Sequence, residues 1–216
     1  MKKSFTYVLF SLFSVNILCV APSVAETTKL PPYVSAAATL GELPAPFGWR
    51  NFCEKYRNEC TGTKIGPPQT KLTPELWQAL NDINQWANHG LESISDMDHW
   101  GKAESWDIPT DGKADCEDFA LLKRNVLARY GFSPSSLLMT IVYNQRQEGH
   151  AILTVVTDRG EFILDNQTDA ILGWEKTGYQ FVERQSQTNP NLWVRIGEGQ
   201  DGILVSSRSE TEKKSK

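Results

Sequence analysis

The chain has 216 residues, of which 40% are hydrophobic and 22% charged, and its formal net charge is −4. This length predicts one domain with a core of its own, and the mild acidity argues against a general nucleic-acid binder, which usually presents a basic face. Beyond the N-terminal segment, no stretch is long and apolar enough to span a bilayer.

Residues 1–25 have the layout of a secretory signal peptide. Two lysines precede an apolar run over residues 5–20, and residues 23–25 supply small side chains at the −3 and −1 positions of a cleavage site. The alternative is an uncleaved anchor helix, because the run is about the minimum length for a bilayer span. A lipoprotein is the weakest alternative, since Leu18 precedes Cys19 where a lipobox needs a small residue.

The four cysteines have different expected fates. Cleavage after Ala25 would remove Cys19. Cys53 and Cys60 lie close together in the sequence, and in an oxidising compartment a local disulfide is favoured over two buried free thiols. Cys116 is then left over, and an odd cysteine in an exported protein indicates an intermolecular bond, an inert buried thiol or a reactive thiol.

The first half of the mature chain predicts an extended start followed by helices. Residues 26–46 predict an extended or loosely ordered lead-in, and the aromatic spacing after them predicts a short helix over 51–57. Thr73 and Pro74 fit the N-cap and the first position of a longer helix. The apolar face of this helix recurs every three or four residues: Leu76, Leu80, Ile83 and Ala87.

A polar and aromatic segment over residues 96–113 predicts a loop that is long enough to suggest function. For its Trp100 and Trp106, core packing or loop anchoring is favoured over a place in a substrate groove or against a receptor. A second helix is predicted over residues 115–130, and Gly131 fits the C′ position that ends it. Its expected buried side consists of Phe119, Leu122, Val126 and Leu127.

After this helix the hydrophobic pattern changes to a period of two, which predicts strands. The expected strands cover residues 136–143, 151–157, 161–164, 179–183 and 192–196. Helices followed by an antiparallel meander indicate an α+β domain, which we place over residues 47–205. Residues 206–216 contain Ser, Glu and Lys without an apolar anchor and predict a disordered tail.

Cys116 is expected at the start of the second helix, within the sequence Asp115-Cys116-Glu117-Asp118. A thiol in the first turn of a helix lies near unsatisfied backbone amides, which lower its pKa and can stabilise an oxyanion. The flanking acids act in the opposite direction and raise the thiol pKa unless a cation neutralises them. The context therefore favours a reactive thiol only if positive charge lies nearby.

A thiol nucleophile also needs a base and an orienting group. Of the three histidines, His150 opens a predicted strand, and Asp165 ends the next one. A hairpin centred on residues 157–158 would place His150 directly opposite Asp165, whereas a turn centred on Arg159 would place them on opposite faces of the sheet. The sequence alone leaves both registers open.

In combination, these motifs resemble the transglutaminase-like branch of the papain-type superfold, and within it the bacterial transglutaminase-like cysteine proteases of the LapG group. The resemblance rests on Asp-Cys-Glu-Asp-Phe-Ala at a helix start, Gly-His at a strand start and Leu-Asp-Asn after a hairpin, and it covers roughly residues 48–196. It implies an α+β, papain-like fold in which N-terminal helices pack on an antiparallel β-sheet.

The resemblance implies a catalytic Cys-His-Asp triad of Cys116, His150 and Asp165. Cys116 would attack a carbonyl as a thiolate. His150 would hold the proton and return it to the leaving amine, and Asp165 would fix the imidazole tautomer.

Proteases of this group depend on calcium, and the resemblance carries this requirement over to Asp115 and Glu117 as metal ligands, with Asp118 as a further candidate. Because Ca²⁺ takes about 6–8 oxygen ligands, other groups must contribute. The acids also have a purely structural role available, since a negative charge in the first turn stabilises a helix by about 0.3–1 kcal/mol. Both roles can hold at once.

By resemblance, we expect a periplasmic, calcium-dependent cysteine endopeptidase. It would cleave a large surface adhesin near its N-terminus, at a small-residue site of the di-alanine type, and promote dispersal of a biofilm. The other expected partner is the periplasmic domain of an inner-membrane receptor for cyclic di-GMP. Two alternatives remain open: an amine acyltransferase or transglutaminase of the same fold, and a non-enzymatic calcium-binding interaction module.

Overall fold

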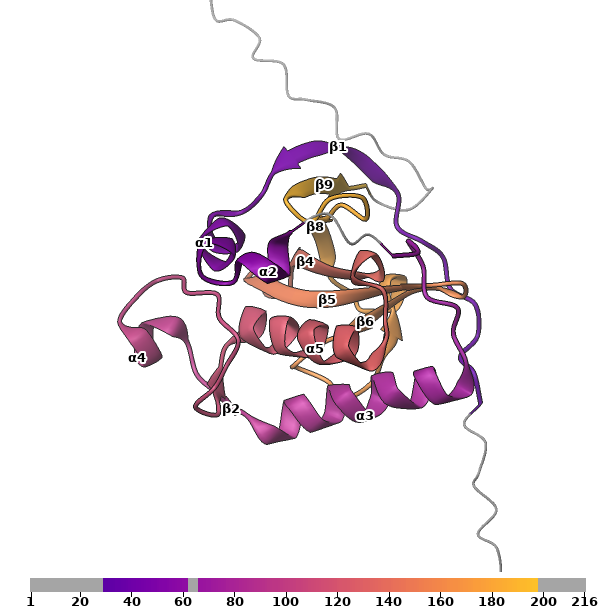
Figure 1. The fold of residues 1–216 in the computed structure, drawn as a ribbon, viewed down its shortest axis with the longest axis horizontal. Helices are drawn as coiled ribbons and strands as arrows, with labels where there is room; N and C mark the ends of the chain where they lie inside the picture. Colours follow the sequence, from indigo (N-terminus) through magenta and orange to yellow (C-terminus); the bar gives the residue numbers. More distant parts are fainter. Residues whose placement is uncertain (1–28, 62–65, 198–216) are drawn as a thin grey trace, which may run out of the picture.

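The computed structural model describes residues 29–61 and 66–197, so the expected signal peptide and C-terminal tail lie outside the described residues. A seven-stranded sheet forms the centre of the fold, α5 (Cys116–Tyr130) packs along it, and α3 (Pro74–Gly90) packs on the far side of α5 (Figure 1). The expected α+β class is confirmed. Within the described ranges, no helix is long and apolar enough to cross a membrane.

The other helical segments are short, and the strands follow the predicted order with additions. The short helices are α1 (Phe47–Lys55), α2 (Arg57–Cys60), α4 (Asp96–Trp100), η1 (Pro134–Ser136) and η2 (Trp174–Lys176). The strands are β1 (Thr39–Pro44), β2 (Glu92–Ser93), β3 (Lys113–Ala114), β4 (Leu137–Tyr143), β5 (Gly149–Thr157), β6 (Gly160–Leu164), β7 (Leu172–Gly173), β8 (Gln180–Gln185) and β9 (Leu192–Ile196).

The two long helices begin and end where local chemistry predicts. The hydroxyl of Thr73 accepts a hydrogen bond from the backbone N–H of Leu76 at 3.2 Å, which makes it the N-cap of α3. Asp115 is the N-cap residue of α5, and Gly131 ends that helix with a φ of 110°, a left-handed conformation that favours glycine. Cys116 is therefore the first residue of α5, as expected.

Two helix predictions were wrong in detail. The helix expected over residues 51–57 begins earlier, at Phe47, and breaks at Tyr56 before α2. The segment expected as a loop contains α4, which is capped by the Ser95 hydroxyl and has only five residues, too few to show an apolar period. Of the two tryptophans in that segment, Trp106 is buried in the main core and Trp100 is 48% exposed.

The seven-stranded sheet has the order β1-β9-β8-β4-β5-β6-β7 with antiparallel pairing between all neighbours. The five strands expected from the sequence are confirmed. The lead-in contributes β1, an edge strand that pairs with β9, and the chain before it crosses to the opposite edge, where the N–H of Val34 donates to the carbonyl of Arg159.

The hairpin between β5 and β6 has a register that neither sequence alternative gave. Thr157 pairs with Gly160, so the turn is centred on residues 158–159. Continuing this register places Asp165 opposite Ile152, two residues from His150. Residues two apart in a strand share a face. His150 and Asp165 therefore lie on the same face of the sheet, on neighbouring strands and offset by two residues along the strand direction.

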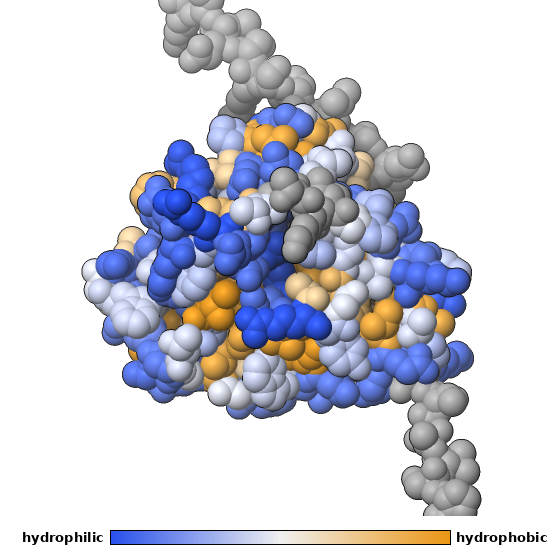
Figure 2. Space-filling model, in the orientation of Figure 1, coloured by the Kyte–Doolittle hydropathy of each residue, from blue (hydrophilic) through white to orange (hydrophobic). Residues whose placement is uncertain are grey.

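A core lies on each face of the sheet. The larger core joins the sheet to the helices, and its sheet residues include Met139 and Leu153; the smaller one contains the neighbours of opposite parity, Val142 and Ile152. Figure 2 shows that the viewed surface carries mostly hydrophilic residues, with separate small apolar patches between them.

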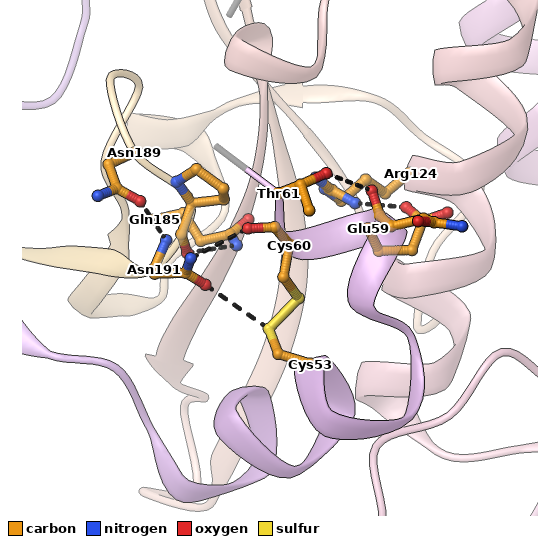
Figure 3. Close-up of a disulfide and its surroundings, with 10 residues drawn as sticks. Cys53, Glu59, Cys60, Thr61, Arg124, Gln185, Asn189 and Asn191 are labelled. Atoms are coloured by element: carbon orange, nitrogen blue, oxygen red, sulfur yellow. Dashed lines mark hydrogen bonds and ion pairs between the residues drawn. A yellow bond between two sulfur atoms is a disulfide. The ribbon is translucent and has the colours of Figure 1, made fainter. Parts of the chain in front are cut away.

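The expected disulfide between Cys53 and Cys60 is confirmed, with the two Cα atoms 5.6 Å apart. It joins α1 to α2, and Asn191 donates to the carbonyl of Cys60 at 3.0 Å (Figure 3). An ion pair of 3.0 Å between Glu59 and Arg124 then ties α2 to α5. The disulfide thus holds α1 and α2 together, and the ion pair holds α2 against the helix that begins with Cys116.

Candidate active site

Cys116 lies where α5 meets the start of β5. It is the free cysteine of the described residues and is partly buried. Its Sγ accepts a hydrogen bond from the backbone N–H of Ala151 at 3.4 Å, and its thiol donates to Oε2 of Glu117 at 3.1 Å. The sulfur therefore lies against the residue that follows His150 in the chain.

His150 and Asp165 form a buried pair, with 2.8 Å between Nε2 and Oδ1 and 3% exposure of each side chain. Since Nε2 faces the carboxylate, Nδ1 is the ring nitrogen that can exchange a proton with another group. The structure thus brings His150 and Asp165 into direct contact and places Cys116 beside the start of the same strand.

Asp165 is held by more than the imidazole. The hydroxyl of Tyr179 donates to its Oδ2 at 2.5 Å, and the N–H of Gln167 donates to its Oδ1 at 3.0 Å. Burial alone would raise the pKa of Asp165, but the hydrogen bonds and charge of His150, with help from Tyr179, leave that pKa below its usual value. A carboxylate that stays ionised can keep the imidazole oriented.

Tyr179 also packs its ring edge-on against His150, with 5.7 Å between the ring centroids. Burial and the Asp165 carboxylate raise the pKa of Tyr179, so its hydroxyl keeps the proton that it donates. The sequence analysis missed this residue, because it precedes a strand 14 positions after Asp165 and no local spacing connects the two.

Three acids form a second cluster beside the thiol. Carboxylate oxygens of Asp96, Asp115 and Glu117 lie within 4.8 Å of one another. The expected metal residues Asp115 and Glu117 are thus together, and Asp96 joins them. Asp118 lies apart from this group of three, since its Oδ1 accepts from the N–H of Asp107 at 2.6 Å.

A two-stranded parallel ladder explains why Asp96 joins residues that follow it by about 20 positions. Strand β2 pairs with β3, and the N–H of Ile94 donates to the carbonyl of Ala114 at 3.0 Å. The residues just after each strand, Asp96 and Asp115, are thereby brought side by side. The sequence analysis missed Asp96 because a ladder of two residues per strand leaves no periodic signal.

These acids are held in surroundings that penalise their charge. Burial raises the pKa of Asp115 to about 6, and the charge of Asp96 adds to this effect. Burial and the charge of Asp115 raise the pKa of Glu117 to about 9, and burial raises that of Asp118 to about 8. Without a cation, burial therefore favours the protonated form of these acids.

The donor set fits a hard divalent cation. All three groups offer carboxylate oxygens, and Oδ1 of Asp115 is buried without a hydrogen-bond partner. A buried, unpaired carboxylate oxygen is costly unless a cation or proton meets it. Calcium prefers oxygen ligands at about 2.3–2.6 Å and tolerates irregular geometry, so Asp96, Asp115 and Glu117 are suitable ligands for it.

The thiol does not gain acidity from the start of α5 in this arrangement. Burial raises the pKa of Cys116 well above its usual value, and the charge of Glu117 raises it further, whereas the hydrogen bond from Ala151 lowers it. The effect of the flanking acids, which the sequence sets against that of the helix terminus, therefore prevails here, and a cation at these carboxylates would offset it.

The remaining two histidines bind other carboxylates. His89 pairs with Asp169 and is exposed, as expected for a surface residue. His99 pairs with Asp111 at 2.8 Å and stacks on Trp100 with 3.8 Å between the ring centroids. His150 is therefore the histidine that lies near the thiol of Cys116.

The chain matches a known family of proteins. A family model described as bacterial transglutaminase-like cysteine proteinase BTLCP matches residues 39–201, which is most of the chain. The chain therefore belongs to this family of cysteine proteinases. A comparison with curated proteins gives no significant match.

Solved structures of LapG from Legionella pneumophila are similar to the chain. The calcium-bound form is 20% identical, with coverage of 74% of this chain and 88% of that chain and a TM-score of 0.49. The EGTA-treated form is 23% identical, with coverage of 60% of this chain and 74% of that chain and a TM-score of 0.46. A further LapG structure is 24% identical, covers 60% of this chain and 72% of that chain, and has a TM-score of 0.47.

Proposed function

We propose that the protein is a calcium-dependent cysteine endopeptidase with Cys116 as nucleophile, His150 as general base and acid, and Asp165 as the orienting carboxylate. The observation that carries this proposal is the position of the Cys116 sulfur against Ala151, directly beside the buried pair of His150 and Asp165. A nucleophile, a base and an orienting group in that order are the parts that thiol catalysis needs.

The reaction would proceed in two halves. Cys116 gives its proton to Nδ1 of His150, and Sγ attacks the carbonyl carbon of the scissile peptide. The first-turn N–H groups of α5, which have no partner within the helix, would stabilise the oxyanion. His150 returns the proton to the leaving amine, and water activated by the same imidazole then hydrolyses the thioester and regenerates the thiol.

Asp96, Asp115 and Glu117 would hold the calcium ion. When bound, the ion supplies positive charge that keeps these carboxylates ionised and offsets their effect on the neighbouring thiol. Support comes from the proximity of the three acids and from the unpaired oxygen of Asp115.

For the substrate, we propose the N-terminal region of a large surface adhesin, cleaved at a di-alanine type of site in the periplasm. Control by the periplasmic domain of an inner-membrane cyclic di-GMP receptor completes the proposal. The signal-peptide layout of residues 1–25 supports export, and membership of the cysteine proteinase family supports a peptide substrate.

The test is cleavage of an adhesin N-terminal fragment by the wild-type protein and by Cys116→Ala. We expect cleavage by the wild type in calcium, at least about a thousandfold less by Cys116→Ala, since loss of a nucleophile costs orders of magnitude, and none in chelator. Tyr130→Ala, at the exposed far end of the same helix, is the matched control and should cleave normally. Undiminished cleavage by Cys116→Ala would refute the proposal.

The same assay distinguishes hydrolysis from acyl transfer. A primary amine is added at increasing concentration, and the products are weighed by mass spectrometry. An endopeptidase gives free carboxylate products throughout. A transglutaminase or amine acyltransferase would instead give amine-linked products as the main species.

A further inference from the structure

Lys123 is a completely buried lysine on the helix that begins with Cys116. Its exposure is 0%, and its Nζ donates to Oδ1 of Asn88 on α3 at 2.6 Å. A buried ammonium group usually needs a charged partner in contact, yet the hydrogen-bond partner here is a neutral amide. The catalytic steps above leave this lysine without a role.

Asn88 also contacts the segment that contains Asp165. Its Nδ2 lies 3.0 and 3.1 Å from the backbone carbonyl oxygens of Asp165 and Thr168 and 3.0 Å from Oδ1 of Asp169, so its two hydrogens are shared among three acceptors. One turn earlier on α3, Nδ2 of Asn84 lies 3.3 Å from the carbonyl of Thr168 and 3.2 Å from that of Asp169. Two amides of one helix thus bind the backbone of residues 165–169.

The lysine and the backbone carbonyls opposite it both fix the orientation of the Asn88 amide. An ammonium group can only donate hydrogen bonds, so it requires the oxygen of the amide on its side. The NH₂ group of Asn88 then faces the backbone carbonyls of the Asp165 segment, which can only accept. A neutral apolar side chain at position 123 would leave Oδ1 of Asn88 buried without its donor, and the amide would lose one of the contacts that hold its orientation.

The charges around the ammonium come from the same segment. Burial lowers the pKa of Lys123 to about 7, whereas the charges of Asp165 and Asp169 raise it. Asp169 is also paired with His89 of α3. The charges of Asp165 and Asp169 therefore favour the protonated form of Lys123.

We propose that Lys123 is a positioning residue that acts through Asn88 to fix the 165–169 segment, and with it the contact between Asp165 and His150. The inference rests on the proposed function, because it assigns the lysine to the same site. It connects the helix of the nucleophile to the loop of the orienting acid by two hydrogen bonds in series, from Lys123 to Asn88 and from Asn88 to Asp165.

Lys123→Met tests the proposal, because Met has similar length but neither charge nor donor. We expect kcat for fragment cleavage to fall about tenfold or more while KM stays within about twofold, since the substrate contacts are untouched. Arg184→Met is the matched control, because it removes another buried cation, which pairs instead with Glu161 at 2.7 Å. It should lower the melting temperature but leave kcat unchanged at temperatures where the variant is folded.

Asn88→Ala provides a second route if Lys123→Met folds poorly, with Asn81→Ala as its control, because the Asn81 amide binds only the carbonyl of Trp77 on its own helix. The double variant Lys123→Met/Asn88→Ala should lose no more activity than Asn88→Ala alone, since the two residues act in series. If the activity losses of Lys123→Met and Asn88→Ala were fully additive in the double variant, the two residues would not act in series.

A readout independent of activity is the downfield imidazole N–H signal of His150 in a proton NMR spectrum. We expect Lys123→Met to shift or broaden this signal and Arg184→Met to leave it unchanged. An unchanged signal together with an unchanged kcat would overturn the positioning role. If Cys116→Ala retained full cleavage, the proposed function would fail, while the NMR comparison would still decide the role of Lys123.

Discussion

At the scale of single residues, the site sets a buried thiol against three acids. Burial and the charge of Glu117 both raise the pKa of Cys116, and only the N–H of Ala151 acts against them. His150 is oriented by Asp165, whose pKa stays below its usual value although the side chain is buried. Reactivity of the thiol therefore depends on the groups around the imidazole as much as on the sulfur itself.

Tyr179→Phe should lower kcat by about three- to thirtyfold with little change in KM. The variant keeps the ring against His150 but removes the hydrogen bond to Asp165, and hydrogen bonds to charged groups contribute about 1.5–3 kcal/mol, part of which would be lost from catalysis. Steady-state kinetics on an adhesin fragment measures the effect. Wild-type kcat in Tyr179→Phe would show that the carboxylate needs no donor beyond His150 and the N–H of Gln167.

Asp96→Asn should weaken calcium binding by about tenfold or more. The substitution keeps the size of the side chain but removes one of the three charges in the acid cluster, and the charge and number of ligands set the affinity of a calcium site. Isothermal titration calorimetry with calcium measures it, and Asp82→Asn, on the exposed side of α3, is the control. An unchanged affinity would exclude Asp96 from the site.

At the scale of elements, the caps and periods of the two long helices and the five main strands could be predicted from the sequence. Local signals define these elements, such as the hydroxyl of Thr73, the glycine at position 131 and the alternation through β4 to β6. Position 116 as the start of α5 follows from the same signals.

The contacts between elements could not be predicted in this way. The register of the β5–β6 hairpin depends on a two-residue turn at 158–159, and the sequence offered other turns of equal merit. Asp96 reaches the acid cluster through the short β2–β3 ladder, and Lys123 reaches the Asp165 segment through another helix. Each is a tertiary contact with no local pattern.

The disulfide between α1 and α2 should contribute about 2–3 kcal/mol to the free energy of unfolding. It closes a short loop, since Cys53 and Cys60 have a sequence separation of 7, and loops of this size give an entropic effect of that order. The paired variant Cys53→Ser/Cys60→Ser should therefore melt about 4–12 °C lower in a calorimetric scan, at about 2–4 °C per kcal/mol. An unchanged melting temperature would contradict a stabilising role.

At the scale of the whole molecule, the acid cluster connects stability to pH and to calcium. The pKa values of Asp115, Glu117 and Asp118 are raised in the folded protein, to about 6, 9 and 8. The folded state therefore binds protons that the unfolded chain has already released above about pH 4. By linkage, the contribution of these acids to stability is present at low pH and is lost as pH rises toward 9.

Calcium should reverse this loss. In chelator, the melting temperature should fall between pH 5 and pH 8, and calcium at about 100 times its Kd should add about 2.7 kcal/mol, or roughly 5–10 °C, at pH 8. Because protons compete for the same oxygens, the calcium effect should be smaller at pH 5. Glu117→Gln, which resembles the protonated acid, should flatten the pH dependence in chelator and lose the calcium response.

A calcium effect of equal size at pH 5 and pH 8 would contradict the proton linkage. The measurement is a set of thermal scans at both pH values, with and without calcium, on the wild type and on Glu117→Gln. Glu183→Gln is a control, because this carboxyl also has a pKa raised by burial but lies on β8 beside Arg195, and it should keep the calcium response.

The central claim is that Cys116 is a nucleophile activated by His150 and Asp165. The rate at which iodoacetamide modifies Cys116 at pH 7 in calcium, followed by peptide mapping of that residue, tests it most directly. We predict a rate at least about tenfold higher in the wild type than in His150→Ala, with His89→Ala matching the wild type. Equal rates in the wild type and His150→Ala would contradict the account.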